Sequence, residues 1–420
     1  MKIIVTAVGS TGDIQPFVAL AEALKRAGHT VKVCSYDIYK KKFDKISVPF
    51  AAVGPPFDDQ RVSDVRDTLK KLSPLKKLDY LVNEVFLYEG EKFYADSIEA
   101  SRGYHFGICH SLDFIGQHVM IQNQIPWASV IFAPGIIPTT FRTPMHLPNL
   151  GRLGNRLSWK ILEWIKAGFE RKIEGYLYRL NGIRRKINAV GTFSPHLNLV
   201  ACSGHVTPTY PDWPGNFVIT GAWFIRGGAY TPPPEVARFV EEGEVDVVFT
   251  FGSMAKAEGE RVEQLFRQAV EKSPLRAIIQ QGWTTVSQTR RESANLLFVD
   301  YNLPHGYLFG RSKIVVHTGG TNTVMEVCKA GAASIVVPQL PDQKYWATVL
   351  HRLGVASKPL LPKNLAAETL TSRIRRVLED GEMLRKAREL SLKIKAEEGT
   401  ENAVRAIEEF VYKDPLRGGG

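Results

Sequence analysis

The sequence predicts an α/β protein in two halves, each built around a parallel β-sheet. Three observations carry this prediction, and the first two are a strand–loop–helix–strand pattern near the start of the chain and a second one between residues 313 and 338. The third is length, because 420 residues with 44% hydrophobic content can bury two cores. Ligands of open α/β sheets bind at the carboxyl ends of the strands, so the loop in each pattern is a candidate binding site.

The first pattern begins at the amino terminus. Residues 3–8 form a short apolar run that stops at Gly9, which predicts a buried parallel strand. Pro16 is expected to open a helix with one apolar face, which ends at Gly28 before a second strand. The loop between strand and helix reads Gly-Ser-Thr-Gly-Asp, residues 9–13.

The second pattern surrounds a polar turn that contains two glycines. A buried strand ends at residue 316, residues 317–323 form the turn, residues 324–329 are the predicted helix, and residues 333–337 are the next strand. Glycine lets a ligand approach the backbone, while the free N–H groups and the dipole of a helix amino terminus attract an anion. The turn is therefore expected to bind a diphosphate. It is not a GxxxxGK[ST] loop, because no lysine stands at the required place.

Composition limits the class of partner. Lys plus Arg number 54 against 43 Asp plus Glu, and this formal charge of +11 favours a nucleotide, an anionic membrane surface or nucleic acid. Nucleic acid is not expected, because no recognition motif is found. The 4 cysteines form no CxxC pair, which is typical of reduced core residues in a cytoplasmic protein. Without a signal peptide or an apolar segment that could span a bilayer, we expect a cytoplasmic location, with peripheral membrane contact as the open alternative.

Residues 159–187 carry apolar side chains at spacings of three and four among many Lys and Arg residues, which predicts an amphipathic helix. The pattern leaves two interpretations open. The helix covers the sheet or the acceptor cleft, or it lies in a membrane interface from which the acceptor is taken. Residues 133–150, rich in proline, threonine and aromatics, predict a long loop, and residues 227–234 predict a linker with flexible and stiff parts.

The two loops resemble a known family of enzymes. Its donor signature is matched by residues 317–323 (HTGGTNT), Glu326, residues 330–331, residues 336–338, Asp342 and Gln343. This signature resembles that of the GT-B nucleotide-sugar glycosyltransferases, nearest the branch of sterol glucosyltransferases and of glycopeptide and macrolide antibiotic glycosyltransferases. Residues 9–16 (GSTGDIQP) resemble the amino-terminal loop of the same branch. The branch usually reads His-His-Gly-Gly-x-Gly-Thr, and this chain departs from it at Thr318 and Asn322.

The resemblance implies a GT-B fold, in which two Rossmann-like domains face each other across a cleft. It divides the chain into an acceptor-binding domain (1–224), a linker (225–242), a nucleotide-sugar-binding domain (243–398) and a carboxy-terminal helix and tail that return to the first domain (399–420). It also implies an inverting transfer of a hexose from a UDP- or TDP-sugar to a hydroxyl of a largely apolar acceptor, such as a sterol, a lipid, a polyketide or another aglycone. No cofactor beyond the nucleotide-sugar co-substrate is expected. No metal site is expected either, because there is no DxD-type motif and helix-end amides can replace a cation.

Asp13 is the candidate general base. Transfer needs a base for the acceptor and electropositive groups for the leaving diphosphate. Asp13 is expected at a helix amino terminus, where the dipole favours an anion. The alternative is that Asp13 only caps the helix. The resemblance favours catalysis, because the family's proposed base stands at this place in its loop.

The candidate ligands of the diphosphate are Ser10, Gly12, Ser253, His317, Thr318, Gly319, Gly320 and Thr321. Ser10 and Ser253 belong to opposite halves and would hold it together only when the domains close; otherwise they are ordinary turn serines. Thr318 stands where the family has a phosphate-binding histidine, and its hydroxyl donates a hydrogen bond without a positive charge. His317 either packs at the strand end or shifts into that role.

By the same resemblance, Glu326 binds the ribose hydroxyls, Trp283 and Leu303 line the base, and the pair Asp342 and Gln343 binds the sugar hydroxyls. Two other functions stay open at this point. A GT-B nucleotide-sugar epimerase would share the donor site but need no acceptor. A non-catalytic helper that binds the donor or a lipid would agree with the departures in the donor loop.

Overall fold

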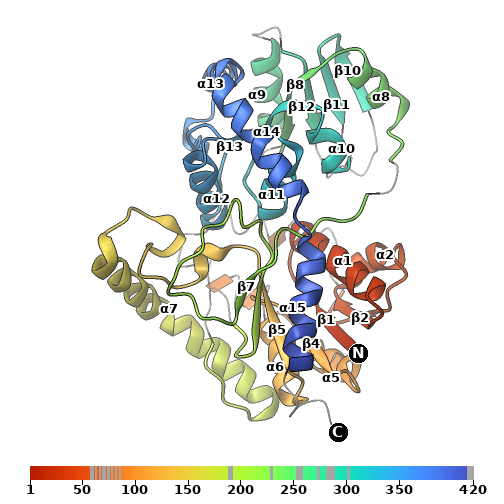
Figure 1. Cartoon of the computed structure of the whole chain (residues 1–420), viewed down its shortest axis with the longest axis vertical. Coiled ribbons are helices and arrows are strands. Elements are labelled where there is room, and N and C mark those ends of the chain that lie inside the picture. The colour runs from red at the N-terminus through yellow and green to blue at the C-terminus, as the bar shows by residue number, and fades with distance from the viewer. Residues whose placement is uncertain are drawn as a thin grey trace. The chain divides into compact units, whose positions relative to one another are not determined.

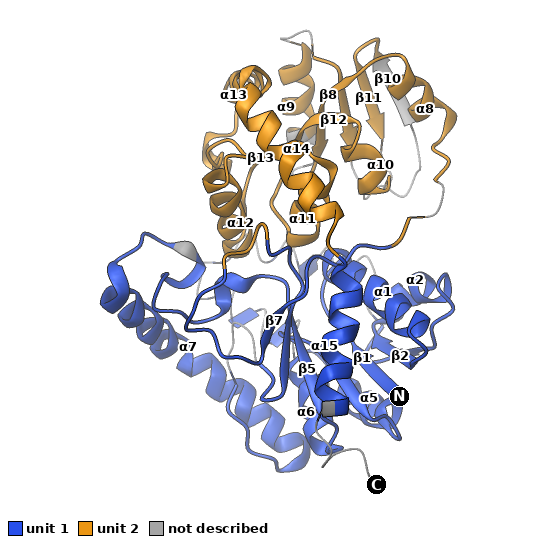
Figure 2. Cartoon of the chain, in the orientation of Figure 1, with its two compact units in different colours: residues 1–204, 209–225, 398–420 blue, residues 205–208, 226–397 orange. Residues whose placement is uncertain are grey.

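A computed structural model gives the fold of the chain (Figure 1). It describes residues 1–56, 61, 64–65, 68, 72, 76, 79–80, 83–84, 87–187, 193–227, 230–251, 259–271, 275–280, 289–299 and 303–413. The chain divides into two compact units (Figure 2). Unit 1 comprises residues 1–204, 209–225 and 398–420, and unit 2 comprises residues 205–208 and 226–397.

Unit 1 is built on a parallel sheet with the strand order β3-β2-β1-β4-β5-β6-β7. Its strands are β1 (Lys2–Thr6), β2 (Thr30–Ser35), β3 (Phe50–Ala52), β4 (Phe106–His110), β5 (Trp127–Ile131), β6 (Leu197–Val200) and β7 (Phe217–Ile219). β4, β5 and β6 are buried along their whole length. Such continuous burial is typical of parallel strands that are covered on both faces.

The described helices of unit 1 are α1 (Thr11–Arg26), α2 (Lys40–Asp44), α5 (Gly90–Ser101), α6 (Phe114–Gln122), α7 (Gly151–Asn181) and α15 (Gly399–Lys413). α15 comes from the end of the chain and packs its apolar face into the core of this unit through Ala403, Val404 and Ile407. Its outer edge is tied to the region of α1 by Glu401, 2.7 Å from Arg26. The carboxy-terminal helix is therefore part of unit 1, as Figure 2 also shows.

Unit 2 has a second sheet, with the strand order β10-β11-β9-β8-β12-β13. Its strands are β8 (Val245–Thr250), β9 (Ala277–Gln280), β10 (Thr289–Ser293), β11 (Leu296–Val299), β12 (Ser312–His317) and β13 (Ala333–Val336). All of these neighbours are parallel except β10 and β11. Its described helices are α8 (Pro234–Glu241), α9 (Gly259–Glu271), α10 (His305–Phe309), α11 (Thr321–Ala330), α12 (Pro341–Arg352), α13 (Ala367–Glu379) and α14 (Gly381–Lys395). The predicted class of two Rossmann-like α/β domains is confirmed.

Each sheet reverses its strand order beside one of the two predicted loops. In unit 1, β1 lies between β2 and β4, and in unit 2, β8 lies between β9 and β12. Thr6 at the end of β1 is in register with Cys109 of β4, and His317 at the end of β12 is in register with Thr250 of β8. These are the topological switch points at which α/β sheets bind ligands. The loop after β1 and the loop after β12 therefore both lie where a site is expected.

The helix starts predicted from the sequence were too late. α1 begins at Thr11, because Ser10 serves as the N-cap, and Pro16 lies inside the helix rather than at its start. α7 begins at Gly151 rather than at residue 159, and its start is fixed by Asn155, whose side chain accepts from the Leu150 N–H at 3.0 Å. In both cases a polar contact, rather than the apolar pattern, sets the first residue.

Candidate active site

The loop after β1 holds Asp13 in a fixed position. The Ser10 N–H and the Ser10 hydroxyl both donate to Oδ2 of Asp13, at 2.8 and 2.9 Å. Gly9 has φ +122°, and a Cβ at this position would lie 2.6 Å from the same oxygen. Only glycine lets the backbone pass so close to the carboxylate. Within the described residues, the hydrogen bonds to this carboxylate are accepted by Oδ2. Oδ1 is therefore left to accept a hydrogen bond from a ligand.

Both interpretations of Asp13 are consistent with this geometry. Asp13 is the third residue of α1, and its bond to the Ser10 N–H satisfies a group that the helix itself cannot pair. This capping uses one oxygen of the carboxylate, and a base needs only the other. The role of Asp13 as the base stays a prediction.

His110 is a residue that the sequence did not connect with Asp13. It ends β4, and its ring lies 6.2 Å from that of Phe17, one helical turn after Asp13, and 5.4 Å from that of Phe132. Its Nδ1 accepts from the Leu112 N–H at 3.0 Å, so the ring proton of the neutral form is on Nε2. Burial lowers the pKa of His110, while the charge of Asp13 acts in the opposite direction.

The long separation in sequence explains why this neighbour was missed. Asp13 follows β1 and His110 ends β4, and the two come together because Thr6 of β1 pairs in register with Cys109 of β4. A strand pattern predicts that both strands exist but not that they are adjacent. The one available signal was that both residues stand at carboxyl ends of buried strands, which meet at one edge of a parallel sheet.

The loop after β12 is shaped around Gly319. This residue has φ +92°, and a Cβ here would lie 2.8 Å from Cγ1 of Val336 and 3.1 Å from the carbonyl oxygen of Gln343. A larger residue would therefore be strained in its own backbone and would also overlap its surroundings. The contact brings the loop against the start of α12, where Gln343 lies.

The helix after this loop presents unpaired N–H groups. Gly320 is the N-cap of α11, and among the described residues the first helical bond runs from the Val324 N–H to the Gly320 carbonyl, 2.9 Å. The N–H groups of Thr321, Asn322 and Thr323 precede this bond and have no acceptor within the helix. No acidic residue stands in the first turn of α11. The end of the helix is thus suited to a negatively charged ligand.

Two threonines border these N–H groups. The hydroxyl of Thr321 accepts from the indole Nε1–H of Trp346 at 2.8 Å, which leaves its own proton free to be donated elsewhere. Thr318 lies between the strand and Gly319 and is 8% exposed. Both side chains can donate to a phosphate oxygen, and neither brings a charge.

His317 is fully buried at the end of β12. Its Nδ1 accepts from the Gly319 N–H at 3.1 Å, and its Nε2 has no partner among the described residues. Burial lowers the pKa of His317 to about 3, and the neighbouring His305 acts in the same direction. His317 is therefore neutral near pH 7 and stabilises the turn from inside. These contacts favour the packing interpretation, although the choice between His317 and Thr318 as the phosphate ligand stays a prediction.

Two of the three predicted nucleoside residues lie in the described part of unit 2. Leu303 is buried directly before α10, and Glu326 is on α11. The two helices meet here, since a Cβ on Gly306 of α10 would lie 4.0 Å from Oε2 of Glu326. Burial raises the pKa of Glu326, and Lys329 opposes this effect. The predicted residues Trp283 and Ser253 lie outside the described residues.

The predicted sugar pair begins α12, next to the donor loop. Oε1 of Gln343 accepts from the N–H groups of Gln339 and Leu340, at 2.8 and 3.1 Å. The amide oxygen is therefore occupied, and the NH₂ group remains to donate to a sugar hydroxyl. Asp342 is half-buried in the same first turn. The structure thus brings Gln343 against Gly319 of the donor loop, as one sugar–diphosphate site would require.

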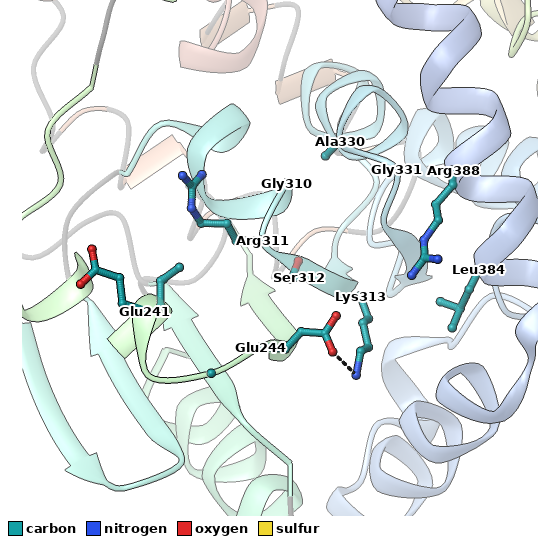
Figure 3. Close-up of a pocket in the computed structure, with 12 residues that line it drawn as sticks. Glu241, Glu244, Gly310, Arg311, Ser312, Lys313, Ala330, Gly331, Leu384 and Arg388 are labelled. Atoms are coloured by element: carbon teal, nitrogen blue, oxygen red, sulfur yellow. Dashed lines mark ion pairs between the residues drawn. The ribbon is translucent and has the colours of Figure 1, made fainter. Parts of the chain in front are cut away.

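A cavity of about 490 Å³ lies at the amino ends of the strands of unit 2, opposite the predicted donor loop (Figure 3). It is lined by residues at the amino ends of β8 and β12, among them Glu244 and Lys313, which form an ion pair of 2.8 Å. None of the predicted site residues lines it. Because parallel sheets bind ligands at the carboxyl ends of their strands, this cavity is not part of the donor site.

The family of the chain follows from comparison with family models. Residues 3–87 match the glycosyltransferase family 28 N-terminal domain, and residues 247–403 match the glycosyltransferase family 28 C-terminal domain. Together the matched residues make up more than half of the chain. The chain belongs to the GT-B glycosyltransferases, and the resemblance seen in its two loops is confirmed.

Two relatives show what the chain is similar to within this family. It is 25% identical to the sterol 3-beta-glucosyltransferase UGT80A2 of Arabidopsis thaliana, over 97% of this chain and 65% of that protein. It is 27% identical to the O-mycaminosyltylonolide 6-deoxyallosyltransferase of Streptomyces fradiae, over 98% of this chain and 97% of that protein. The chain therefore spans less than two thirds of the plant relative but nearly all of the bacterial one.

Solved structures agree on the fold. The glycosyltransferase of kitacinnamycin has a TM-score of 0.71 and 15% identity, covering 97% of this chain and 98% of its own. The glycosyltransferase SsfS6 of Streptomyces sp. SF2575, complexed with thymidine diphosphate, has a TM-score of 0.67 and 16% identity, covering 97% and 99%. At this identity the comparison establishes the GT-B fold of the chain.

Proposed function

We propose that the chain is an inverting, metal-independent glycosyltransferase that moves a hexose from a UDP- or TDP-sugar to a hydroxyl of a largely apolar acceptor. The observation that carries the proposal is the carboxylate of Asp13, held through Oδ2 by both donors of Ser10 at the carboxyl edge of the sheet of unit 1. The names of the relatives support an apolar acceptor, since one acts on a sterol and the other on O-mycaminosyltylonolide. The thymidine diphosphate complex of SsfS6 supports a nucleoside diphosphate donor.

On the acceptor side, Asp13 takes the proton. The acceptor hydroxyl donates to Oδ1, and its proton passes to the carboxylate as its oxygen forms a bond to the anomeric carbon. The Ser10 bonds keep the carboxylate from turning away. The charge of Asp13 acts on His110, but burial lowers the pKa of this ring, so it stays neutral and does not neutralise the carboxylate.

On the donor side, α11 stabilises the leaving group. The bond between the anomeric carbon and the β-phosphate oxygen breaks, and its electron pair goes to the departing diphosphate. The N–H groups at the start of α11 and the hydroxyls of Thr318 and Thr321 would donate to that charge, as oriented dipoles can in place of a cation. Attack from the face opposite the diphosphate inverts the anomeric configuration. Glu326 would bind the ribose, and Asp342 with Gln343 the sugar.

The proposal is tested by incubating the chain with UDP- and TDP-hexoses, with and without a panel of sterols, lipids and aglycones. We expect a new glycoside with inverted anomeric configuration only when an acceptor is present, and equal turnover in EDTA. The anomeric configuration is read by NMR. A sugar epimer formed from donor alone would replace this proposal with the epimerase function. Donor binding without product across the whole panel would favour the non-catalytic helper.

A further inference from the structure

One helix of unit 1 leaves a line of large apolar side chains in solvent. The α7 stripe consists of Leu150, Leu153, Leu157, Ile161, Trp164 and Ile165, with exposed fractions between 46% and 84%. Steps of three and four residues place them on one face of α7 and its first turn. At 1.5 Å per residue the stripe is about 22 Å long. A continuous apolar surface of this kind marks an interaction site.

The stripe is not needed to hold α7 on its own unit. The opposite face of the helix is buried through Trp159, Ile173 and Leu177. On this face the indole N–H of Trp159 donates to the Arg142 carbonyl at 2.9 Å, and the ammonium of Lys166 pairs with the Glu170 carboxylate at 3.2 Å. α7 therefore already has a core-facing side, and the stripe is a second apolar face turned outward.

The charge on the outward face has one sign. By the helical period, the charged residues beside the stripe and in continuation of it are Lys160, Arg171, Lys172 and Arg179. The acidic residues of α7, Glu163, Glu170 and Glu174, lie away from this face. Lys172 also forms an ion pair with the exposed Asp79 at 2.9 Å. The other three basic residues keep the net charge beside the stripe positive.

We propose that the α7 stripe docks unit 1 onto an anionic lipid bilayer. The apolar side chains would lie among the upper acyl chains, and the basic residues would meet the headgroups, as in interfacial amphipathic helices. α7 lies on the bilayer rather than crossing it, since no described helix is long and apolar enough to span a membrane. The docking goes beyond the transfer reaction and does not depend on it.

Charge favours a bilayer over a second copy of the chain. In a dimer through the α7 stripe, the basic residues of both copies would face each other, and like charges in an interface are unfavourable. The chain as a whole carries a formal charge of +11, which adds to the repulsion. An anionic bilayer offers the opposite charge together with an apolar interior. Both features of the helix are then satisfied at once.

The test is binding of the full chain to vesicles of phosphatidylcholine with and without phosphatidylserine, measured by flotation in the absence of donor and acceptor. The double variant Leu153→Gln/Trp164→Gln should lose at least about tenfold in vesicle affinity, because two large apolar groups no longer leave water. The matched control Leu392→Gln changes a leucine that is 70% exposed on α14 and should bind like the wild type. Lys160→Gln/Arg171→Gln should lose roughly fivefold per charge, and only on the anionic vesicles.

The substituted side chains are exposed, so all variants should keep the thermal unfolding temperature of the wild type. Sedimentation velocity without lipid should show the same mass for the wild type and the double variant. The proposal is overturned if the wild type does not float with anionic vesicles, or if the double variant floats equally well. It is also overturned if the double variant converts a dimer into a monomer, since the stripe would then hold two copies together. Because flotation needs no substrate, failure here leaves the transfer reaction untouched, and a loss of transferase activity leaves docking untouched.

Discussion

The loop after β1 and the loop after β12 are built alike but treat negative charge in opposite ways. Each follows a buried parallel strand at a switch point, contains a glycine with positive φ, and leads into a helix. In unit 1 the loop supplies its own anion, because Asp13 at the third helical position accepts from Ser10. In unit 2 that position is Thr323, and the first turn of α11 contains no acidic residue. One local fold thus fixes a carboxylate in one unit and leaves room for a phosphate in the other.

We infer that the residue at the third helical position determines which group such a loop can bind. A carboxylate at the third position pairs with the N–H groups at the helix start, and a neutral residue leaves them for a ligand. The glycines make both arrangements sterically possible, and they do not choose between them. Two kinds of substitution test this inference: a carboxylate placed in the loop of unit 2, and a change of each glycine separately.

The largest effect on donor affinity should come from placing a carboxylate in the loop of unit 2. Thr323→Asp would put a negative charge within the first turn of α11, where it competes with the diphosphate for the same N–H groups. We expect the affinity for UDP and TDP to fall at least about tenfold, since like charges a few ångströms apart repel by several kcal/mol at an effective dielectric of about 20. Isothermal titration calorimetry measures the affinity. Thr323→Asn introduces a side chain of nearly the same shape as aspartate but without the charge, and it should bind UDP and TDP within a few-fold of the wild type. An equal loss of affinity in both variants would contradict the electrostatic reason.

Alanine in place of Gly319 or Gly9 should impair different properties of the protein. In Gly319→Ala the alanine would be strained at positive φ and would overlap with Val336 and the Gln343 backbone. Donor affinity should therefore fall roughly 5- to 30-fold, which corresponds to about 1–2 kcal/mol of backbone strain. Gly9→Ala pushes against Asp13, so turnover should fall by a similar factor while donor affinity stays. Turnover assays and nucleotide titration separate the two.

Two glycines outside the loops serve as controls for backbone strain alone. Gly28 has φ +85° with no atom near its Cβ position, and Gly354 has φ +72° and faces only the flexible end of Lys386. Alanine at either position should lower the free energy of unfolding without a change in turnover or affinity. If Gly9→Ala weakened the donor as much as Gly319→Ala, the division of roles between the loops would be wrong.

Thr318→Val tests which side chain meets the phosphate. The variant removes the hydroxyl and keeps the shape, so donor affinity should fall roughly fivefold for a hydrogen bond of about 1 kcal/mol. The fall should be the same at pH 6 and pH 8, because a hydroxyl does not titrate there. Thr318→His should instead tighten binding as pH falls through about 6.5, where an unperturbed histidine gains its charge. His317 would be the phosphate ligand instead if two results were found together. Thr318→Val would leave the donor affinity unchanged, and donor binding by the wild type would strengthen as the pH falls.

The last effect outside catalysis concerns acid stability. Burial lowers the pKa of His317 to about 3, below its ordinary value of 6.5, so between these two pH values the unfolded chain binds more protons than the folded one. The stabilisation is complete above pH 6.5 and is lost as pH falls toward 3. From pH 7 to pH 5 we expect the wild type to lose about 2 kcal/mol more in unfolding free energy than His317→Asn. Urea unfolding at both pH values measures this, and the exposed His105→Asn should behave like the wild type.

Much of the fold followed from local patterns, and the site followed only in part. The apolar runs and the glycines after β1 and β12 predicted both units, because burial and positive φ are local requirements. The neighbourhood of His110 and Asp13 was not predicted, since it depends on which strands pair. The periodicity of α7 predicted a helix with an apolar face, but two apolar faces need coordinates to be told apart: Trp159 is buried and Trp164 is 80% exposed.

The proposed role of the Asp13 carboxylate as the base is tested by Asp13→Asn with two readouts. The amide oxygen can still accept from Ser10, so the loop should keep its shape. Turnover should fall 10²- to 10⁴-fold, as expected for loss of a general base, while the affinity for UDP or TDP stays unchanged. Asp380→Asn changes another capping carboxylate, which accepts from the Met383 N–H at 2.9 Å, and should keep full turnover. Turnover of Asp13→Asn within a few-fold of the wild type would show that Asp13 is not the base and would leave it as a helix cap alone.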